Sequence, residues 1–205
     1  MSLFLRFQKE GKMKGHFFAV INRMKYITRW GLMRNTESEN LQQHSFQTAI
    51  LAHALAVIEN TLFDGHADAD RAAVIALYHD ASEIITGDMP TPVKYYNDEI
   101  QKAYQQIEVR ANDLLLEKLP ESLRPVYTQV LHAQSSPEWV FVKAADTLSA
   151  YIKCVEELKA GNEEFLNAKK TIEKKLQQYE LKSLQLFLKE FLESYSLTLD
   201  DQTSL

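Results

Sequence analysis

Four residues on the apolar faces of three predicted helices carry side chains that commonly bind metal ions in proteins. They are His44, His79, Asp80 and Asp146. His44 begins an apolar stripe that continues with helical spacing over residues 48–58, so its imidazole is expected to point inward. His79 and Asp80 end the apolar helical run over residues 72–78, and Asp146 shares a face with apolar residues of a third predicted helix. All four side chains are therefore expected to face the protein interior.

These residue types favour a bound divalent cation. A buried carboxylate without a partner is unfavourable, so each aspartate on a core stripe needs a basic side chain, several hydrogen-bond donors or a metal ion. Two imidazoles and two carboxylates suit a first-row divalent metal and leave positions open for water and substrate. Taken singly, each residue is more simply a core histidine or a capped aspartate. The ordered set predicts one metal site, and cobalt, manganese, zinc and iron all fit its mixed ligands.

The remaining histidines do not clearly extend this set. His53 follows His44 by nine residues, which is about 180° around a helix, so it should face away from the site. His66 lies in a predicted turn, His16 opens the first predicted helix, and His132 follows an apolar run without a partner nearby in sequence. The pattern therefore favours a single metal over a two-metal site that uses additional histidines.

Helical periodicity runs through nearly the whole chain, and no segment shows a convincing strand-like alternation of apolar and polar residues. The expected fold class is therefore all-α. Gly87–Pro92 contains two prolines and one glycine close to His79 and Asp80, and it is expected to be a stiff connector that presents its backbone to a ligand. Helices are expected at about residues 14–27, 38–62, 69–85, 97–118, 122–132, 137–160, 163–179 and 181–194.

Length and charge limit the function classes. The 205 residues suit one domain with a full hydrophobic core. The 23 basic and 28 acidic residues give a net charge of −5, which argues against a broad surface for a nucleic acid polymer. A small anionic substrate fits if a bound cation supplies local positive charge. The single cysteine, Cys154, and the lack of a signal peptide or membrane span predict a cytoplasmic protein with no membrane association.

The order H…HD…D in consecutive helices resembles the HD phosphohydrolase superfamily, whose four ligands hold the catalytic metal. A narrower similarity, to the bacterial 5'-deoxynucleotidases, runs from about Met13 to near the C-terminus, and members of that family typically begin near this position. The resemblance implies an N-terminal extension over residues 1–12 and a single HD-type helical bundle over residues 13–195. The polar composition of residues 196–205 predicts a C-terminal tail. The matching segments are Arg29-Trp30, Leu32-Met33-Arg34-Asn35, Gln43-His44-Ser45, Tyr78–Glu83, Thr86–Tyr95 and Ala144-Ala145-Asp146.

The resemblance assigns roles to residues around the metal. His44, His79, Asp80 and Asp146 become the metal ligands. Glu83 lies four residues after His79 and three after Asp80. If the helix continues, its carboxylate reaches the side of the helix that faces the metal, where it can orient or deprotonate a water. Asp88, in the stiff connector, is the second acid-base candidate, and the sequence does not divide the two roles.

The resemblance also implies how the substrate is held. The planar fork of Arg29 suits phosphate oxygens, and Trp30 would pack on the sugar and exclude a 2'-hydroxyl by bulk. Without the resemblance, these two residues are more simply a helix-end charge and a core aromatic. The residues expected to contact or border the substrate are Arg29, Trp30, His44, Asp80, Asp88, Met89, Pro90, Thr91, Lys94 and Asp146.

The expected activity is hydrolysis of deoxyribonucleoside 5'-monophosphates by a metal-activated water, without a covalent intermediate, so Cys154 is assigned to packing. One alternative is an HD hydrolase of a triphosphate, a cyclic nucleotide or a guanosine polyphosphate. Another is a helical module that binds nucleotides without catalysis. The family also forms dimers, and apolar stripes in the C-terminal segments Phe165–Tyr179 and Leu184–Phe191 make a homodimer plausible, although they can equally close the core of one chain.

Overall fold

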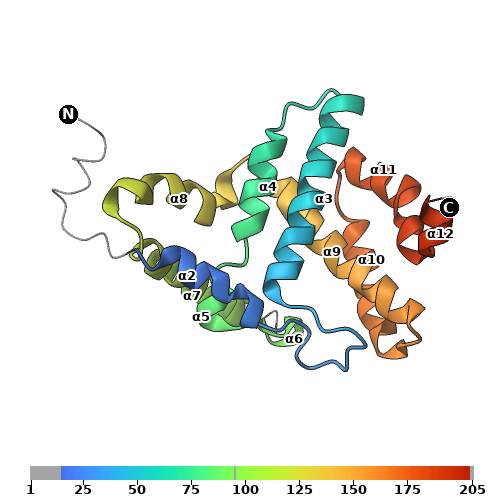
Figure 1. Ribbon diagram of the computed structural model, residues 1–205, viewed down its shortest axis with the longest axis horizontal. Helices are drawn as coiled ribbons and strands as arrows, with labels where there is room; N and C mark the ends of the chain where they lie inside the picture. Colours follow the sequence, from blue (N-terminus) through green and yellow to red (C-terminus); the bar gives the residue numbers. More distant parts are fainter. Residues whose placement is uncertain (1–14, 95, 204–205) are drawn as a thin grey trace.

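Helices make up most of this computed structural model, which describes residues 15–94 and 96–203 (Figure 1). Within that part of the chain, the strand-like pairing is one isolated antiparallel bridge between Thr28 and Asn40. The predicted all-α fold class is therefore confirmed. None of the helices in the described ranges combines the length and the apolar character needed to cross a membrane.

The centre of the molecule is formed by α3 (Leu41–Leu62), α4 (Ala69–Tyr78) and α9 (Trp139–Lys159) (Figure 1). A capping box starts α3: the Asn40 side chain accepts a hydrogen bond from the backbone N–H of Gln43, and the Gln43 side chain accepts one from that of Asn40. The Asp68 carboxylate caps α4 in the same way, by accepting from the N–H three residues later. These caps fix where α3, which carries His44, and α4, which leads into the turn with His79, begin.

The larger hydrophobic core lies among these helices and two more from the C-terminal part of the chain. Ala52, Ala76 and Ala145 are fully buried, and their small side chains allow close approach of the three central helices. Leu184 and Phe187 close the same core from the C-terminal side. The two C-terminal helices are α10 (Leu166–Leu176) and α11 (Lys182–Glu190).

A second, smaller core lies on the other side of the central helices (Figure 1). Phe17, Leu115 and Leu131 meet there, together with Ala81 from the turn that follows α4. This core is built by α2 (Phe17–Ile21), α7 (Asp98–Leu116) and α8 (Arg124–Leu131). The remaining short elements are η1 (Asn22–Tyr26), α5 (Glu83–Thr86), α6 (Thr91–Lys94), η2 (Glu121–Leu123), η3 (Ala133–Ser135), η4 (Glu163–Phe165), η5 (Leu192–Ser196) and α12 (Leu199–Thr203).

The helix predicted over residues 69–85 is divided at the position that matters most. It ends at Tyr78, and residues 79–82 form tight turns in which Ala81 donates to the Tyr78 carbonyl at 3.0 Å. Ala81 is fully buried in the smaller core, so its packing holds the chain away from a continuous helical path. A new helix, α5, starts at Glu83. The prediction of one uninterrupted helix was therefore wrong.

Other differences are smaller. The helices predicted over 14–27 and 163–179 each include a 3-10 segment, η1 and η4 respectively. The polar tail predicted over 196–205 contains α12, which begins where the Thr198 hydroxyl accepts from the N–H of Asp201 and the Asp201 carboxylate accepts from the N–H of Thr198. The N-terminal extension over residues 1–12 lies outside the described residues, and the domain limits stay predictions.

Candidate metal centre

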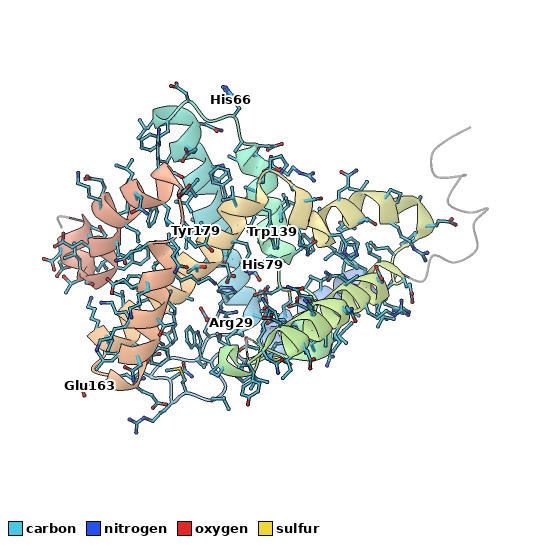
Figure 2. The ribbon with its side chains drawn as sticks, turned by 180° about the vertical axis from the view of Figure 1, so that it is seen from behind. Arg29, His66, His79, Trp139, Glu163 and Tyr179 are labelled. Atoms are coloured by element: carbon cyan, nitrogen blue, oxygen red, sulfur yellow. The ribbon has the colours of Figure 1, made fainter. Side chains whose placement is uncertain are left out.

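The four predicted ligands converge in the structure. Their ligand atoms all lie within 4.8 Å of one another, and this is the one such group of three or more found in residues 15–94 and 96–203. His44 comes from the start of α3, His79 and Asp80 come from the turn after α4, and Asp146 comes from α9. Figure 2 shows His79 and Arg29 near the middle of the molecule, far from His66 on its outer edge.

Both imidazoles turn the same ring nitrogen towards the carboxylates. His44 Nε2 is 3.2 Å from Asp146 Oδ1 and 3.5 Å from Asp80 Oδ2. His79 Nε2 is 3.1 Å from Asp80 Oδ2 and 3.8 Å from Asp146 Oδ1. One oxygen of each aspartate therefore faces both histidines, as expected for ligands that share a small central volume.

Contacts on the far side of each ring leave these Nε2 atoms available as ligands. His79 Nδ1 lies 2.7 Å from the carbonyl oxygen of Ala76, so in the neutral ring the N–H is at Nδ1 and the lone pair is at Nε2. The side chain of His79 is almost fully buried, and Nε2 has no hydrogen-bond partner in spite of the nearby carboxylates. A buried nitrogen lone pair that faces two acidic oxygens is the arrangement that a cation completes. The donor set therefore fits a divalent metal.

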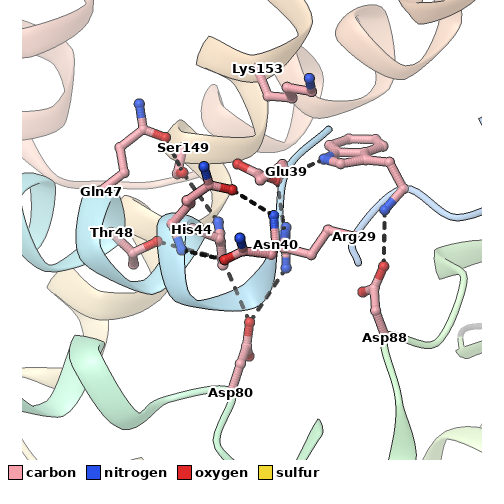
Figure 3. Close-up of polar contacts among 12 residues, drawn as sticks. Arg29, Glu39, Asn40, His44, Gln47, Thr48, Asp80, Asp88, Ser149 and Lys153 are labelled. Carbon is pink, nitrogen blue, oxygen red and sulfur yellow. Dashed lines mark hydrogen bonds and ion pairs between the residues drawn. The ribbon is translucent and has the colours of Figure 1, made fainter. Parts of the chain in front are cut away.

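A second set of polar residues, which sequence reasoning missed, orients His44. Ser149 donates to the side-chain oxygen of Gln47 at 2.7 Å, so its own oxygen can accept from Nδ1 of His44 at 3.2 Å (Figure 3). This places the lone pair of His44 on Nε2, as for His79. The spacing of Ser149 three residues after Asp146 on α9 was the available signal, because such residues share a helical face.

The charge balance of the cluster also favours a cation. Burial alone would lower the pKa of His79, but the carboxylates of Asp80 and Asp146 outweigh it and raise that pKa to about 10. Burial would likewise raise the pKa of Asp146, but Lys143 and the two histidines hold it well below its ordinary value. Lys143 Nζ lies 2.5 Å from Asp146 Oδ2, which leaves Oδ1 facing the histidines. The site attracts positive charge. Without a metal ion His79 therefore holds a second proton, on Nε2, and a metal ion can replace that proton.

Arg29 and Trp30 lie beside this cluster because their segment pairs with the residues that lead into α3. The backbone N–H of Arg29 donates to the carbonyl of Glu39 at 2.9 Å, next to the bridge between Thr28 and Asn40. Arg29 Nη1 is 3.5 Å from Asp80 Oδ2, so the guanidinium points at the predicted metal site. Burial would lower the pKa of Arg29, but Asp80 and Glu39 outweigh it and raise that pKa, so the side chain remains a cation.

Glu83 and Asp88 are both partly or fully buried near the cluster, although the helix does not continue from Asp80 to Glu83. Glu83 is 5% exposed, and its Oε2 has no hydrogen-bond partner. Burial, followed by the charge of Asp80, raises the pKa of Glu83 well above its ordinary value. Asp88 accepts a hydrogen bond from the backbone N–H of Trp30 at 3.1 Å, and burial is also the main reason why its pKa is raised.

The connector predicted over Gly87–Pro92 follows α5, and the residues predicted to contact the substrate there differ in exposure. Met89 and Pro90 are partly buried, whereas Thr91 is exposed at the start of α6. Lys94 Nζ lies 2.8 Å from Glu108 and 4.7 Å from the ring centre of Tyr104. The Lys94 ammonium thus already has partners, and its predicted contact with an anion stays a prediction.

The other sequence predictions have simple outcomes. His53 is exposed and faces away from the cluster, as predicted. Its Nε2 lies 3.6 Å from Oδ1 of Asp70. His132 has a partner that sequence reasoning did not find, Asp113 at 3.1 Å. Cys154 is buried, and burial raises the pKa of its thiol to about 12, which agrees with a packing role rather than a nucleophilic one.

A buried carboxylate on α9 anchors the segment that follows Trp30. Glu157 accepts hydrogen bonds from the backbone and hydroxyl of Thr36, at 2.9 and 2.6 Å, and from the Asn162 amide at 2.8 Å. Lys153 pairs with the same carboxylate and also donates to the carbonyl of Glu37 at 2.6 Å. Sequence reasoning missed this anchor because the segment at Thr36 lies more than a hundred residues from Glu157 in the chain.

Replacement of Glu157 by alanine is expected to lower the free energy of unfolding by roughly 3–5 kcal/mol, because it leaves the buried charge of Lys153 without its carboxylate partner. Burial would raise the pKa of Glu157, but hydrogen bonds from Lys153 and Thr36 outweigh it and lower that pKa. The stabilising effect of Glu157 is therefore present above the ordinary carboxyl pKa and is lost as the pH falls. Urea unfolding at several pH values should show a difference between wild type and variant that shrinks below about pH 4. Glu163→Ala, at an exposed position, is the control, and an equal loss in both variants would contradict the anchoring role.

Solved structures with a similar arrangement of helices identify the class of fold. The chain superposes on an HD-domain phosphohydrolase from Listeria innocua with a TM-score of 0.77 and 22% sequence identity, over 88% of each chain. It also superposes on the HD phosphohydrolase DatZ of cyanophage S-2L, solved with dA and one catalytic Zn²⁺ ion, with a TM-score of 0.59 and 20% identity, over 86% of this chain and 96% of that one. The fold is that of the HD-domain phosphohydrolases.

Sequence similarity narrows this class to one family. The YfbR-like 5'-deoxynucleotidase family matches residues 16–195. A 5'-deoxynucleotidase of Photobacterium profundum is 49% identical over 190 residues, which cover 92% of this chain and 98% of that protein. The 5'-deoxynucleotidase YfbR of Escherichia coli is 47% identical over 190 residues, which cover 92% of this chain and 96% of that protein. The chain belongs to the YfbR-like 5'-deoxynucleotidase family.

Proposed function

We propose that this protein is a metal-dependent 5'-deoxynucleotidase, which hydrolyses deoxyribonucleoside 5'-monophosphates to deoxyribonucleosides and phosphate. The observation that carries the proposal is the buried Arg29 guanidinium directly beside the cluster of His44, His79, Asp80 and Asp146. A guanidinium and a cation that face the same small volume suit the oxygens of one phosphate group. Family membership supports the same activity, because relatives with 47–50% identity carry the name 5'-deoxynucleotidase.

The cluster is proposed to hold one divalent transition metal. The unpartnered Nε2 of His79 and the acidic oxygens around it support this role. When bound, the ion would activate a water for attack on phosphorus and neutralise phosphate charge, and either effect is worth several kcal/mol in the transition state. Cobalt, manganese, zinc and iron all accept mixed histidine and aspartate ligands.

The residues around the cluster divide into acid-base and binding roles. Glu83 has a buried oxygen without a hydrogen-bond partner and lies near Asp80. We therefore propose that it accepts the proton of the attacking water. Asp88 is held by the backbone of Trp30, so we place it on the sugar side, where it can protonate the departing 5'-oxygen. Arg29 holds the phosphate. Trp30 packs on the sugar and leaves no space for a 2'-hydroxyl.

The remaining predicted contacts belong to the nucleoside end of the substrate. Met89, Pro90 and Thr91 are proposed to line the pocket for the base, since they follow Asp88 directly in the connector. Lys94 can serve as an anion contact if it exchanges Glu108 for the substrate. The proposed substrate is a small molecule, with no role for a nucleic acid polymer or a membrane, and the buried single cysteine agrees with action in the cytoplasm.

A phosphate-release assay tests this function. The metal-free protein is reloaded with cobalt, manganese, zinc or iron, and each form is offered ribo- and deoxyribonucleoside 5'-monophosphates. We expect free phosphate from the deoxyribonucleotides and much less from the ribonucleotides. The same assays with triphosphates, guanosine polyphosphates and cyclic nucleotides test the alternative of an HD hydrolase with another substrate. Release of pyrophosphate from a triphosphate or a guanosine polyphosphate, or of a 5'-monophosphate from a cyclic nucleotide, would support that alternative.

The protein is also proposed to form a homodimer, but through a different surface from the one that the sequence pattern indicated. The C-terminal stripes mostly pack inside one chain, because Leu184 and Phe187 belong to the larger core. An exposed apolar surface lies instead on neighbouring faces of α3 and α4, which the contact between His53 and Asp70 brings together. Its residues are Phe46, Ile50 and Val57 of α3 and Val74 and Leu77 of α4. A two-fold axis can place this surface against its own copy.

Replacement of Phe46 by glutamate is therefore expected to convert the dimer to a monomer, because it would bury a charge in the apolar interface. Size-exclusion chromatography with light scattering gives the mass directly. Val126→Glu is the matched control, since Val126 is an equally exposed apolar residue on α8. A monomeric wild-type protein, or a dimeric Phe46 variant, would show that this surface is not the interface.

A further inference from the structure

We propose that Glu39 is a positioning residue that holds the phosphate-binding arginine and the sugar-packing tryptophan in one fixed relation, so that it controls selection of the deoxyribose. One of its oxygens, Oε2, accepts hydrogen bonds from Arg29 Nε at 3.0 Å and from Trp30 Nε1 at 3.1 Å (Figure 3). This inference rests on the proposed function, since it assigns a role within the same substrate site.

The position of Glu39 is itself fixed by the backbone around it. Its carbonyl accepts from the N–H of Arg29 at 2.9 Å, and it directly precedes Asn40, the capping residue of α3. The side chain is only 12% exposed, as is that of Arg29. A buried carboxylate with two short bonds to fixed donors has little freedom to move, and hydrogen bonds with a charged acceptor are stronger than neutral ones.

The bond to Arg29 determines which part of the guanidinium faces the substrate. Glu39 binds the Nε edge, and Nη1 then points towards Asp80 at 3.5 Å. The terminal nitrogens of the fork are thus directed at the volume where the phosphate is expected. Without Glu39, the guanidinium could rotate about its last bonds and pair with Asp80 alone, which would weaken the grip on phosphate.

The bond to Trp30 determines where the indole stands. The backbone N–H of Trp30 is held by Asp88, and the indole ring packs on Phe165 with 5.3 Å between ring centres. Trp30 also has a φ of 59°, an unusual backbone conformation for a bulky residue, so surrounding contacts must hold it. Glu39 supplies the polar contact at the ring nitrogen. An indole fixed at both ends cannot shift aside to admit a 2'-hydroxyl.

Kinetics with a deoxyribonucleotide and the ribonucleotide of the same base test this role. In Glu39→Ala we expect the KM for the deoxyribonucleotide to rise about tenfold, and the ratio of kcat/KM values, deoxyribo over ribo, to fall about tenfold, the usual effect of one lost hydrogen bond to a charged group. Glu39→Gln keeps an acceptor oxygen at the same position and should keep the ratio within about threefold of wild type. The ratio does not depend on how much of the variant is folded, so loss of stability alone cannot change it.

Two further variants make the result decisive. Glu37→Ala is the matched control, because Glu37 is exposed and only its backbone makes contacts near Glu157 and Lys153. Glu39→Asp, which is too short to reach both donors, should lower the ratio if the alanine variant does not fold. A wild-type ratio in either Glu39→Ala or Glu39→Asp would overturn the inference. Absence of activity on 5'-monophosphates in the wild-type protein would instead refute the proposed function itself.

Discussion

His79→Ala should lower kcat for a deoxyribonucleoside 5'-monophosphate by about a thousandfold or more and should also reduce the metal content of the protein. The imidazole is buried, its Nδ1 is fixed on the Ala76 carbonyl, and its free Nε2 points at both aspartates. Alanine removes one of the four proposed ligands of the metal ion. A metal effect of several kcal/mol in the transition state corresponds to about this loss in rate.

Metal analysis and steady-state kinetics on the same preparation measure both effects. The control is His66→Ala, because His66 is exposed and lies on the outer edge of the molecule, far from His79 (Figure 2). Circular dichroism should show that both variants retain their helices. If His79→Ala bound nucleotide and metal as the wild type does, with unchanged turnover, the protein would be the non-catalytic binding module considered as an alternative.

Glu83→Gln should lower kcat by about a hundredfold to ten-thousandfold while metal content stays unchanged, because it removes a proton-transfer group without removing a ligand. Glu83 is the buried carboxyl whose Oε2 lacks a partner, and burial together with the charge of Asp80 raises its pKa well above the ordinary value. A structural carboxylate in this position would be expected to have bonded partners. Glu99→Gln, on the exposed first turn of α7, is the control.

The same variant separates the roles of the two acid-base candidates when it is compared with Asp88→Asn. An aryl phosphate has a leaving group that departs without protonation, so it needs a group for the attacking water but not one for the leaving oxygen. We expect Glu83→Gln to be impaired on both substrate types and Asp88→Asn to recover most activity on the aryl phosphate. The reverse pattern would exchange the two assignments.

The fold class and the inward direction of the candidate ligands could be predicted because they depend on local patterns, and the family resemblance joined these ligands into one site. Helical spacing placed His44 and Asp146 on buried faces of α3 and α9, and the structure brings them together with His79 and Asp80. Spacing of three or four residues is fixed by the geometry of a single helix, so it needs no knowledge of the rest of the fold.

What could not be predicted depends on contacts between distant segments. The break after Tyr78 arises because Ala81 packs into the smaller core with residues from α2, α7 and α8. Glu39 is unremarkable in sequence, and its role follows only from the pairing of its segment with that of Arg29. Glu157 is likewise an ordinary helix position until the segment at Thr36 folds onto it. Such roles become visible only in three dimensions.

The turn that carries His79 and Asp80 joins two parts of the molecule mechanically. Ala76, just before it, belongs to the larger core, and Ala81, just after it, belongs to the smaller one. An ion bound by residues of this turn, of α3 and of α9 would link the larger core to the smaller one. Loss of the ion would then lower the stability of the whole protein as well as its activity, because the two cores could separate and water could enter between them.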